Sequence, residues 1–318
     1  MAILGIDLGG TKLAVGVFSE DGKILSKEII PLGSRAGKDV GFLITNAISK
    51  HFKISSIESI GVSVPGISRI KTGTVWAPNI QGWEDYPLMQ EIKQVAENIP
   101  VIIDSDRACY ILGEHWQGGA KQINDAIFLA VGTGIGAGIL INGTVLRGAH
   151  DIAGAIGWMA LDRPFKNKYI GCGCFEYHAS GEGITKMARE ILNEQKNYSG
   201  ELKNIEPAKL TSANIFSAYE KNDPVATQVL QQCIEFWGMS VANLVSLFNP
   251  EKIIFGGGVF GPAVQFIDAI KTEAAKWAQP ISITQVSLVP SALGGDAGIY
   301  GAGFLALQNK NHQQSGHV

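Results

Sequence analysis

The chain has 318 residues, 46% of them hydrophobic, so it is long enough for two domains that each bury a substantial core. Its 26 basic and 29 acidic residues give a net charge of -3 without a block of one sign, which argues against nucleic-acid and membrane partners. Four cysteines are too few for a disulfide framework, and the first residues form no basic and apolar leader, so we expect a cytoplasmic protein.

The chain begins with the pattern of a three-stranded antiparallel meander. Apolar runs predict strands at 3–7 and 13–18, joined by the glycine turn Gly9-Gly10-Thr11. A third strand is expected after the turn at Asp21-Gly22.

The same pattern returns in the middle of the chain. Strands are predicted at 126–131, 137–141 and 144–146, and the turn between the first two contains Gly132-Thr133-Gly134. The chain therefore reads as an internal duplication.

Helices and buried strands follow each meander. Helical spacing covers 86–98 and 223–247, and apolar runs at 101–104 and 253–255 predict strands, the second of which ends in Gly256-Gly257-Gly258. We therefore expect two α/β halves that face one another across a cleft, where glycine-rich turns let backbone amides approach a phosphate. A single glycine turn is equally compatible with a plain hairpin, and its recurrence at three places favours ligand binding.

Five motifs, taken together, resemble the ROK family (repressor, open reading frame, kinase), and the resemblance covers nearly the whole chain. The motifs are Asp7–Lys12, Ser63–Ile67 with Pro78-Asn79, Asp104–Asp106 with Leu112-Gly113-Glu114, Gly132–Gly138 and Gly256–Gly258. The resemblance implies an α/β protein with the actin-like ATPase fold (ribonuclease H-like), shared with sugar kinases and heat-shock-70 proteins. Many ROK repressors carry a winged-helix segment before the first motif, and here Asp7 is near the start, so we do not expect a repressor.

Two duplicated domains are expected from these motifs. The first spans residues 1–117 and is completed by a C-terminal helix within 296–318, and the second spans 118–295. Hinges are predicted near Gly118-Gly119 and after Gly294-Gly295, with the helix ending near Leu307 before a polar tail.

The resemblance implies ATP-dependent, Mg²⁺-dependent phosphorylation of a sugar or sugar-like hydroxyl. Asp106 resembles the catalytic aspartate of the family, the general base that takes the proton from the hydroxyl. The alternative is a helix N-cap, for which Ser105 is equally suited. Asp7 is expected to orient hydrated Mg²⁺, unless it only braces the glycine turn.

The expected nucleotide site contains the three glycine segments. Thr11 and Lys12 would meet phosphate oxygens beside Gly9 and Gly10. Backbone amides of Gly132 and Gly134 and the hydroxyl of Thr133 would hold the outer phosphates, and Gly256, Gly257 and Gly258 would lie against the base or ribose.

By resemblance, the sugar pocket is lined by Gly66, Asn79, Ser105, Asp106 and Glu176. For Glu176 the alternative is a solvated helix end. The partner is therefore a small sugar or polyol, and a homo-oligomer is expected because ROK kinases are commonly dimers or tetramers.

The sequence departs from the family at Ala155 and Trp158, where ROK hexokinases typically carry glutamate and histidine. Both family side chains bind sugar hydroxyls, so the substrate is open among another hexose, an amino sugar derivative and a polyol. A non-catalytic sugar- or nucleotide-binding regulator is the main alternative, and an ATPase or chaperone-like module is a third.

The same family histidine joins three cysteines around a structural zinc. If Cys174 is the last of these cysteines, Asn167 and Tyr169 stand where the other two should be, and if Cys172 and Cys174 are the first pair, a deletion follows them. Either way the ligands are too few, so we expect no zinc. His150, Asp151 and His178 lie near this segment and are candidates for replacement ligands or substrate contacts, and the alternative is that they are ordinary loop or surface residues.

Overall fold

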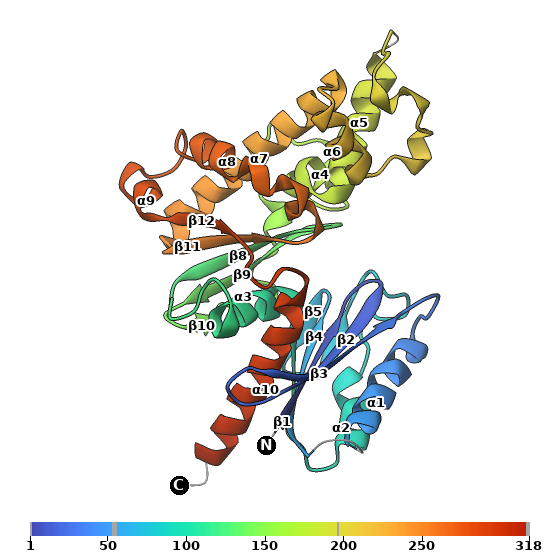
Figure 1. Ribbon diagram of the computed structural model, residues 1–318, viewed down its shortest axis with the longest axis vertical. Helices are drawn as coiled ribbons and strands as arrows, with labels where there is room; N and C mark the ends of the chain where they lie inside the picture. The colour runs from blue at the N-terminus through green and yellow to red at the C-terminus, as the bar shows by residue number, and fades with distance from the viewer. Residues whose placement is uncertain (1, 53–55, 196, 316–318) are drawn as a thin grey trace. The chain divides into compact units, whose positions relative to one another are not determined.

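A computed structural model describes residues 2–52, 56–195 and 197–315, which form two compact units (Figure 1). Unit 1 comprises Met1–Asn124, Gly138–Gly154 and Ser291–Val318, and unit 2 comprises Asp125–Ala137 and Ala155–Pro290. These units group 118–124, 138–154 and 291–295 with the first part of the chain, and the domain boundaries expected from sequence stay a prediction.

Unit 1 is built on a five-stranded mixed sheet with the order β3-β2-β1-β4-β7. The strands β1, β2 and β3 form the expected antiparallel meander, and β4 and β7 extend it in parallel. The strands are β1 (Ala2–Leu8), β2 (Lys12–Phe18), β3 (Ile24–Pro31), β4 (Ile57–Val64) and β7 (Val101–Ser105). A separate two-stranded sheet pairs β5 (Ile67–Arg69) with β6 (Thr74–Trp76).

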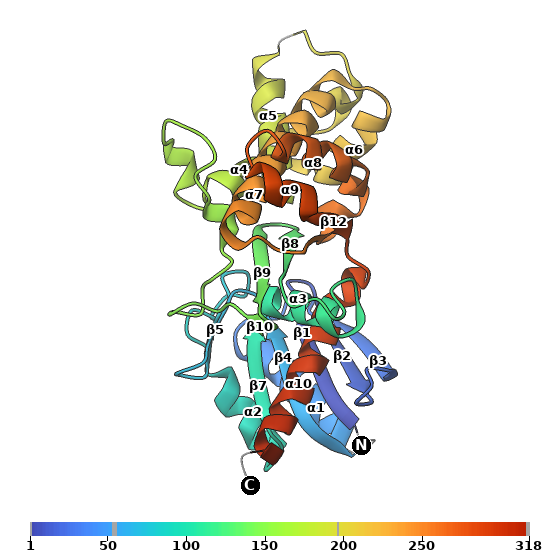
Figure 2. The ribbon, with the colours of Figure 1, turned by 90° about the vertical axis from the view of Figure 1, so that its left-hand side faces the viewer.

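Helices cover both faces of this sheet, with α1 and α2 on one face and α10 on the other (Figures 1 and 2). The bounds are α1 (Lys38–Phe52), α2 (Leu88–Ala96), α3 (Asp106–Gln117) and α10 (Ala297–Ser315). Alternate residues of β1 serve the two faces, since Leu4 and Ile6 pack with α1 and α2 while Ile3 packs with α10. On the α10 side a Cβ at Gly61 would collide with the carbonyl of Ala302, so this helix lies very close to the sheet.

The prediction for the end of the chain is partly wrong. The terminal helix continues past Leu307 to Ser315, so the polar tail expected from 309 is helical as far as the structure describes it. Beyond Leu307, Lys310 is buried and its Nζ pairs with the carboxylates of Glu20 and Glu58, so contacts with distant residues stabilise the helix past its sequence signal. Residues 316–318 lie outside the described residues.

The second sheet has the order β10-β9-β8-β11-β12 and so repeats the strand order of the first. Its strands are β8 (Ala126–Val131), β9 (Ile135–Ile141), β10 (Thr144–Val145), β11 (Lys252–Gly256) and β12 (Ser287–Pro290). This match confirms the internal duplication.

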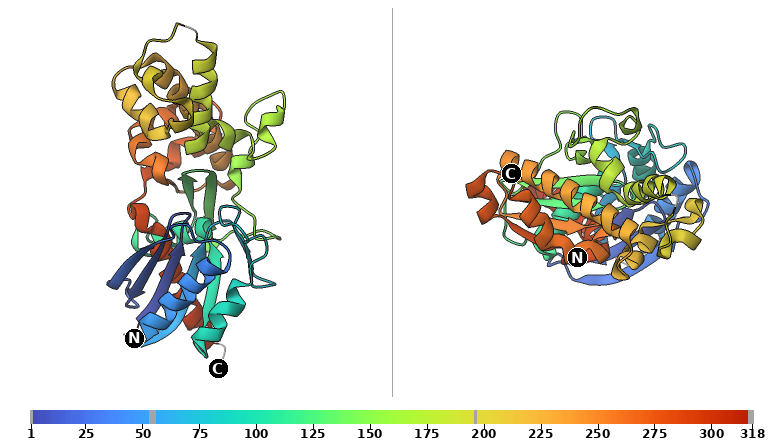
Figure 3. Two further views of the ribbon diagram at one scale, coloured as in Figure 1. Left: turned by 90° about the vertical axis from the view of Figure 1, so that its right-hand side faces the viewer. Right: turned by 90° about the horizontal axis from the view of Figure 1, so that it is seen from above.

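The helices of unit 2 gather on one side of β8, β11 and β12 (Figures 1 and 3). They are α4 (Cys174–Ala179), α5 (Gly181–Glu194), α6 (Ser212–Glu220), α7 (Pro224–Phe248), α8 (Ile267–Ala274) and α9 (Pro280–Gln285). Asp223 caps α7 by accepting from two backbone amides, and Trp237 in the middle of α7 is fully buried. None of the described helices is long and apolar enough to span a membrane.

Short 3-10 turns complete the described structure. They are η1 (Ile156–Trp158), η2 (Asn167–Tyr169), η3 (Glu201–Asn204), η4 (Pro207–Lys209), η5 (Gly258–Phe260), η6 (Pro262–Phe266) and η7 (Gly294–Asp296).

Candidate functional site

Asp7 lies at the carboxyl end of β1, on the side of the sheet that faces α10. Its Oδ1 accepts a hydrogen bond of 2.6 Å from the Ser63 hydroxyl at the end of the neighbouring strand β4, and Gly298 of α10 lies against the carboxylate. Burial raises the pKa of Asp7 and Asp296 adds to the rise, while Ser63 and Lys12 oppose it. A partly buried carboxylate whose charge is this weakly compensated is suited to a cation.

Asp106 is the first residue of α3, directly after β7. The N-cap is Ser105, whose Oγ accepts from the amide of Ala108 at 3.3 Å, so the alternative that Asp106 itself caps the helix is wrong. The Asp106 side chain is therefore available for another role at the end of this strand.

The surroundings of Asp106 adjust its basicity. Burial raises its pKa to about 6, with a further rise from the charge of Asp7, while the guanidinium of Arg107 lowers it. The Tyr110 hydroxyl lies 3.5 Å from Oδ2. A carboxylate that titrates near neutrality can take up a proton efficiently, which fits a general base.

Gly66 lies between β4 and β5, close to Asp106 in the fold. The Arg107 guanidinium donates to the Gly66 carbonyl at 3.2 Å, and pairing of β5 with β6 brings Gly66 beside Trp76. Asn79 is exposed in the turn that follows β6.

An ion pair fixes the strand that leads to Asp106. The Arg147 guanidinium binds Oδ2 of the buried Asp104 carboxylate through both Nε, at 2.8 Å, and Nη2, at 2.7 Å, and the other oxygen accepts from the amide of Ser105. These contacts at both oxygens set the direction of the backbone just before Asp106.

In unit 2 the Gly132–Gly134 turn lies next to the glycines that follow β11. Gly256 pairs with Ala130, and Gly257 adopts φ +87°, where a Cβ would collide with Val131. Because β8 and β11 are parallel neighbours, both glycine segments stand at the same edge of the sheet.

The N-terminus of α5 joins this edge. The amide of Gly181 donates to the Gly132 carbonyl at 2.7 Å, and Ser180 caps the helix by accepting from the amide of Gly183 at 3.0 Å. Helix α5 therefore holds the glycine turn in place and adds the positive end of its dipole nearby.

Glu176 of α4 also contacts the glycine turn. Its Oε2 accepts from the amide of Ile135 at 2.7 Å, and burial raises its pKa. The alternative that Glu176 is a solvated helix end is therefore wrong.

The segment that departs from the family is partly exposed. Trp158 is 59% exposed, His150 is exposed, and Asp151 accepts from the amide of Ile70 at 3.2 Å. His178 is buried, with its Nε2 at 3.0 Å from the Tyr169 hydroxyl, and burial lowers its pKa to about 4. It is therefore neutral near pH 7.

The expected site residues thus fall into two sets. Unit 1 holds Asp7, Gly9, Gly10, Thr11, Lys12, Gly66, Asn79, Ser105 and Asp106, and unit 2 holds Gly132, Thr133, Gly134, Glu176, Gly256, Gly257 and Gly258. Within unit 1 the Asp7 and Asp106 charges influence one another, and within unit 2 the glycine segments and Glu176 are in contact.

Several supporting residues were not predicted. Ser63 and Gly298 contact Asp7, Arg107 contacts Gly66, and Arg147 pairs with Asp104. Ser63 carried a signal in its motif at the end of a strand, whereas Gly298 and Arg147 are distant in sequence and carried none.

Comparisons with known proteins confirm the expected fold. The sequence model of the ROK family matches residues 3–309. A glucokinase from Halalkalibacterium halodurans is 32% identical over 327 residues, covering 99% of this chain and 97% of that protein. The solved structure of a ROK family glucokinase from Streptomyces griseus, in complex with glucose and AMPPNP, has a TM-score of 0.79 at 29% identity, over 97% of this chain and 100% of that one.

A solved ROK family transcriptional regulator, a homologue of the E. coli MLC protein, is also similar. Its TM-score is 0.85 at 25% identity, and it covers 98% of this chain and 80% of that one. Kinases and regulators therefore share this fold, and only the site can separate the two activities.

Proposed function

This chain belongs to the ROK family, and from that membership we propose that it is an ATP-dependent kinase that phosphorylates a hydroxyl of a sugar or sugar-like molecule. The observation that carries the proposal is Asp106: its side chain is free of the N-cap role, partly buried, and shifted in pKa to about 6. A carboxylate with this basicity at the end of a strand is suited to take the proton of a hydroxyl as a general base.

The residues present fit a nucleotide and its metal. The exposed turn from Gly10 to Lys12 would meet phosphates in unit 1, and Asp7 would hold the hydration shell of Mg²⁺. In unit 2, Gly132–Gly134 and Gly256–Gly258 would hold the remaining phosphates and the base or ribose. When bound, ATP supplies the phosphoryl group, and Mg²⁺ neutralises the negative charge of the phosphates.

The chain's own residues would then prepare the hydroxyl. Asp106 accepts the hydroxyl proton, and Arg107 keeps that carboxyl ionised near neutral pH while holding the Gly66 carbonyl. Gly66, Asn79, Ser105 and Glu176 are proposed to line the sugar pocket. Phosphoryl transfer depends mainly on this positioning.

A sugar-binding regulator without turnover is the second candidate. It is favoured by Ala155 and Trp158, which lack the polar groups that the family uses to bind sugar hydroxyls, and by the similarity to a solved regulator.

A cytoplasmic location and assembly into a homo-oligomer also stay predictions.

The test is ADP release from the purified protein with Mg-ATP and a panel of hexoses, N-acetylhexosamines and polyols. We expect release with at least one compound, and its loss in Asp106→Asn. Asp268→Asn is the matched control, because Asp268 is exposed on α8. Binding of a sugar without ADP release across the panel would instead establish the regulator.

A further inference from the structure

The segment before α4 is where the zinc of the ROK resemblance would be held, and its residues do not fit that metal. Cys172 is half-buried, Cys174 is buried, and Trp158 replaces the family histidine. Among residues 2–52, 56–195 and 197–315, no group of three or more His, Cys, Asp or Glu side chains is placed to hold an ion. A closed tetrahedral site needs four ligands.

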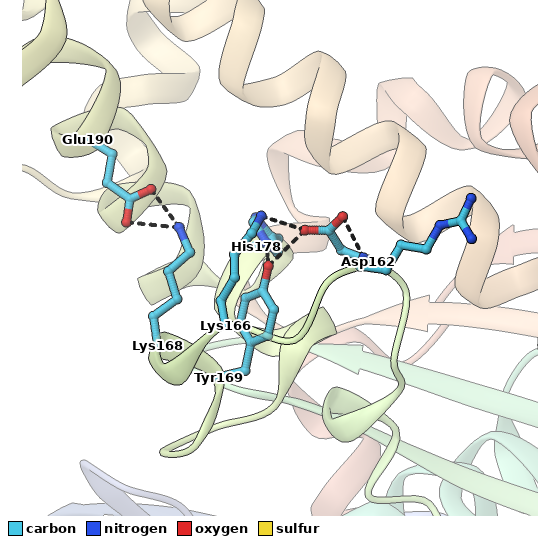
Figure 4. Close-up of polar contacts among 7 residues, drawn as sticks. Asp162, Lys166, Lys168, Tyr169, His178 and Glu190 are labelled. Carbon is cyan, nitrogen blue, oxygen red and sulfur yellow. Dashed lines mark hydrogen bonds and ion pairs between the residues drawn. The ribbon is translucent and has the colours of Figure 1, made fainter.

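A hydrogen-bonded chain of three side chains occupies this segment (Figure 4). Tyr169, only 3% exposed, lies between Asp162 and His178, with its hydroxyl 2.8 Å from Asp162 Oδ2 and 3.0 Å from His178 Nε2. Lys166 Nζ is 2.8 Å from the same carboxylate oxygen, and the amide of Arg163 donates to the other oxygen at 2.7 Å.

The direction of these hydrogen bonds follows from the charges. The carboxylate of Asp162, paired with Lys166, is ionised and only accepts, so the single proton of the Tyr169 hydroxyl points to it. His178 must then donate from Nε2, which leaves Nδ1 as the unprotonated nitrogen. This Nδ1 is buried without a hydrogen-bond partner among the described residues.

Packing holds the imidazole of His178 in this orientation. Its ring stacks on Phe236 of α7, with ring centroids 4.3 Å apart and an angle of 8° between the planes. The ring of Tyr169 meets it edge-on at 5.5 Å. The chain therefore connects the segment that begins at Asp162 both to α4, which carries His178, and to α7.

A second contact fixes the same segment to α5. Lys168 Nζ lies 2.9 Å from Glu190 Oε2, and the Tyr177 hydroxyl also donates to Glu190. Lys168 additionally lies 4.5 Å from the centre of the Tyr177 ring. Figures 2 and 3 show the segment leaving the body of unit 2 before it returns to α4, and these two connections join it to α4, α5 and α7.

We propose that the Asp162–Tyr169–His178 chain replaces the structural metal and positions Glu176 for the sugar. Glu176 and His178 are two residues apart on the short helix α4 and so point in different directions, one to the Ile135 amide and one to the chain. Fixing His178 therefore fixes the orientation of α4 and with it Glu176. The role in sugar binding rests on the proposed function, whereas the replacement of the metal does not.

Metal content is the first test. Protein purified without chelators should contain far less than one zinc per chain, and a zinc chelator should leave its melting temperature unchanged. One bound zinc per chain, or a chelator-induced fall in melting temperature, would overturn the proposal.

Tyr169→Phe is the second test, because it removes the hydroxyl and keeps the ring. We expect the KM for the sugar to rise roughly 3- to 10-fold, as for one lost hydrogen bond, while kcat and the KM for ATP stay within about twofold. Tyr219→Phe is the matched control, since the ring of Tyr219 packs on Phe266 and its hydroxyl makes no hydrogen bond within the described residues. An unchanged KM for the sugar, or an equal loss in all three constants, would overturn the positioning role.

His178 provides a rescue and a direct readout. His178→Gln keeps an N–H donor and should bind the sugar better than His178→Leu. Equal binding by the two variants would contradict the positioning role of the Asp162–Tyr169–His178 hydrogen bonds. Nitrogen-15 spectra of the wild-type protein should show Nε2 protonated and Nδ1 unprotonated, and the opposite tautomer would overturn it. If no compound of the panel is phosphorylated, the kinase proposal fails, while metal content and tautomer still decide whether the chain replaces the metal.

Discussion

The basicity of Asp106 leads to a pH dependence that can be worked out in advance. With a pKa of about 6 in the folded protein, Asp106 is about 90% ionised at pH 7 and about 10% ionised at pH 5. Only the ionised carboxylate accepts the hydroxyl proton, so kcat/KM should fall about tenfold for each pH unit below 6. Asp106→Asn should lower kcat by roughly 100- to 10,000-fold at pH 7.

Arg107 offers a second, independent way to change the pKa of Asp106. Arg107 lowers the pKa of Asp106, so Arg107→Met should move the acid limb of the profile to higher pH, with the loss of activity beginning above pH 6. The assay is initial ADP release from pH 5 to 8 with the best sugar of the panel. A profile that is flat down to pH 5, or an Asp106→Asn variant with wild-type kcat, would refute the reasoning.

Three further outcomes are expected. Gly61→Ala should destabilise the protein by about 3 kcal/mol or more in urea unfolding, because the new methyl group collides with the Ala302 carbonyl, whereas Gly171→Ala, with nothing within 4 Å of a Cβ, should be close to neutral. Asp7→Asn should lower kcat/KM roughly 100-fold and raise the Mg²⁺ concentration for half-maximal rate, and an unchanged Mg²⁺ titration would remove Asp7 from the metal site. Burial lowers the pKa of His178 to about 4 from the value of 6.5 for an exposed histidine, so between these pH values the unfolded chain binds more protons and stability falls as pH falls. The wild-type melting temperature should therefore drop more over this window than that of His178→Gln.

Much of the fold was predictable because it is written in local patterns. Apolar runs predicted β1 and β2, and the strand expected at 144–146 is β10, because these signals need only neighbours in sequence. The end of α10 was not predictable, since Lys310 near that end pairs with Glu20 and Glu58, which are far away in the sequence.

The candidate site divides in the same way. Asp106 and the glycine turns lie at strand ends, which a sequence pattern reveals. Whether Ser105 or Asp106 is the N-cap of α3 could be decided only from the structure. The three residues that are hydrogen-bonded in series, Asp162, Tyr169 and His178, belong to no repeat or motif in the sequence. These hydrogen bonds form because the 3-10 turn that carries Tyr169 lies between the loop at Asp162 and α4, which carries His178, and only tertiary structure can show this.

The close contact of α10 with the first sheet has a consequence for how the protein is made. Unit 1 needs residues 297–315 to cover one face of a sheet whose strands β1 to β7 were synthesised first. Until those residues leave the ribosome, Ile3 and Phe18 lack their cover, and the apolar face they form is open to aggregation. All residues of unit 2 have been synthesised by Pro290, so unit 2 can fold before α10 of unit 1 has been synthesised.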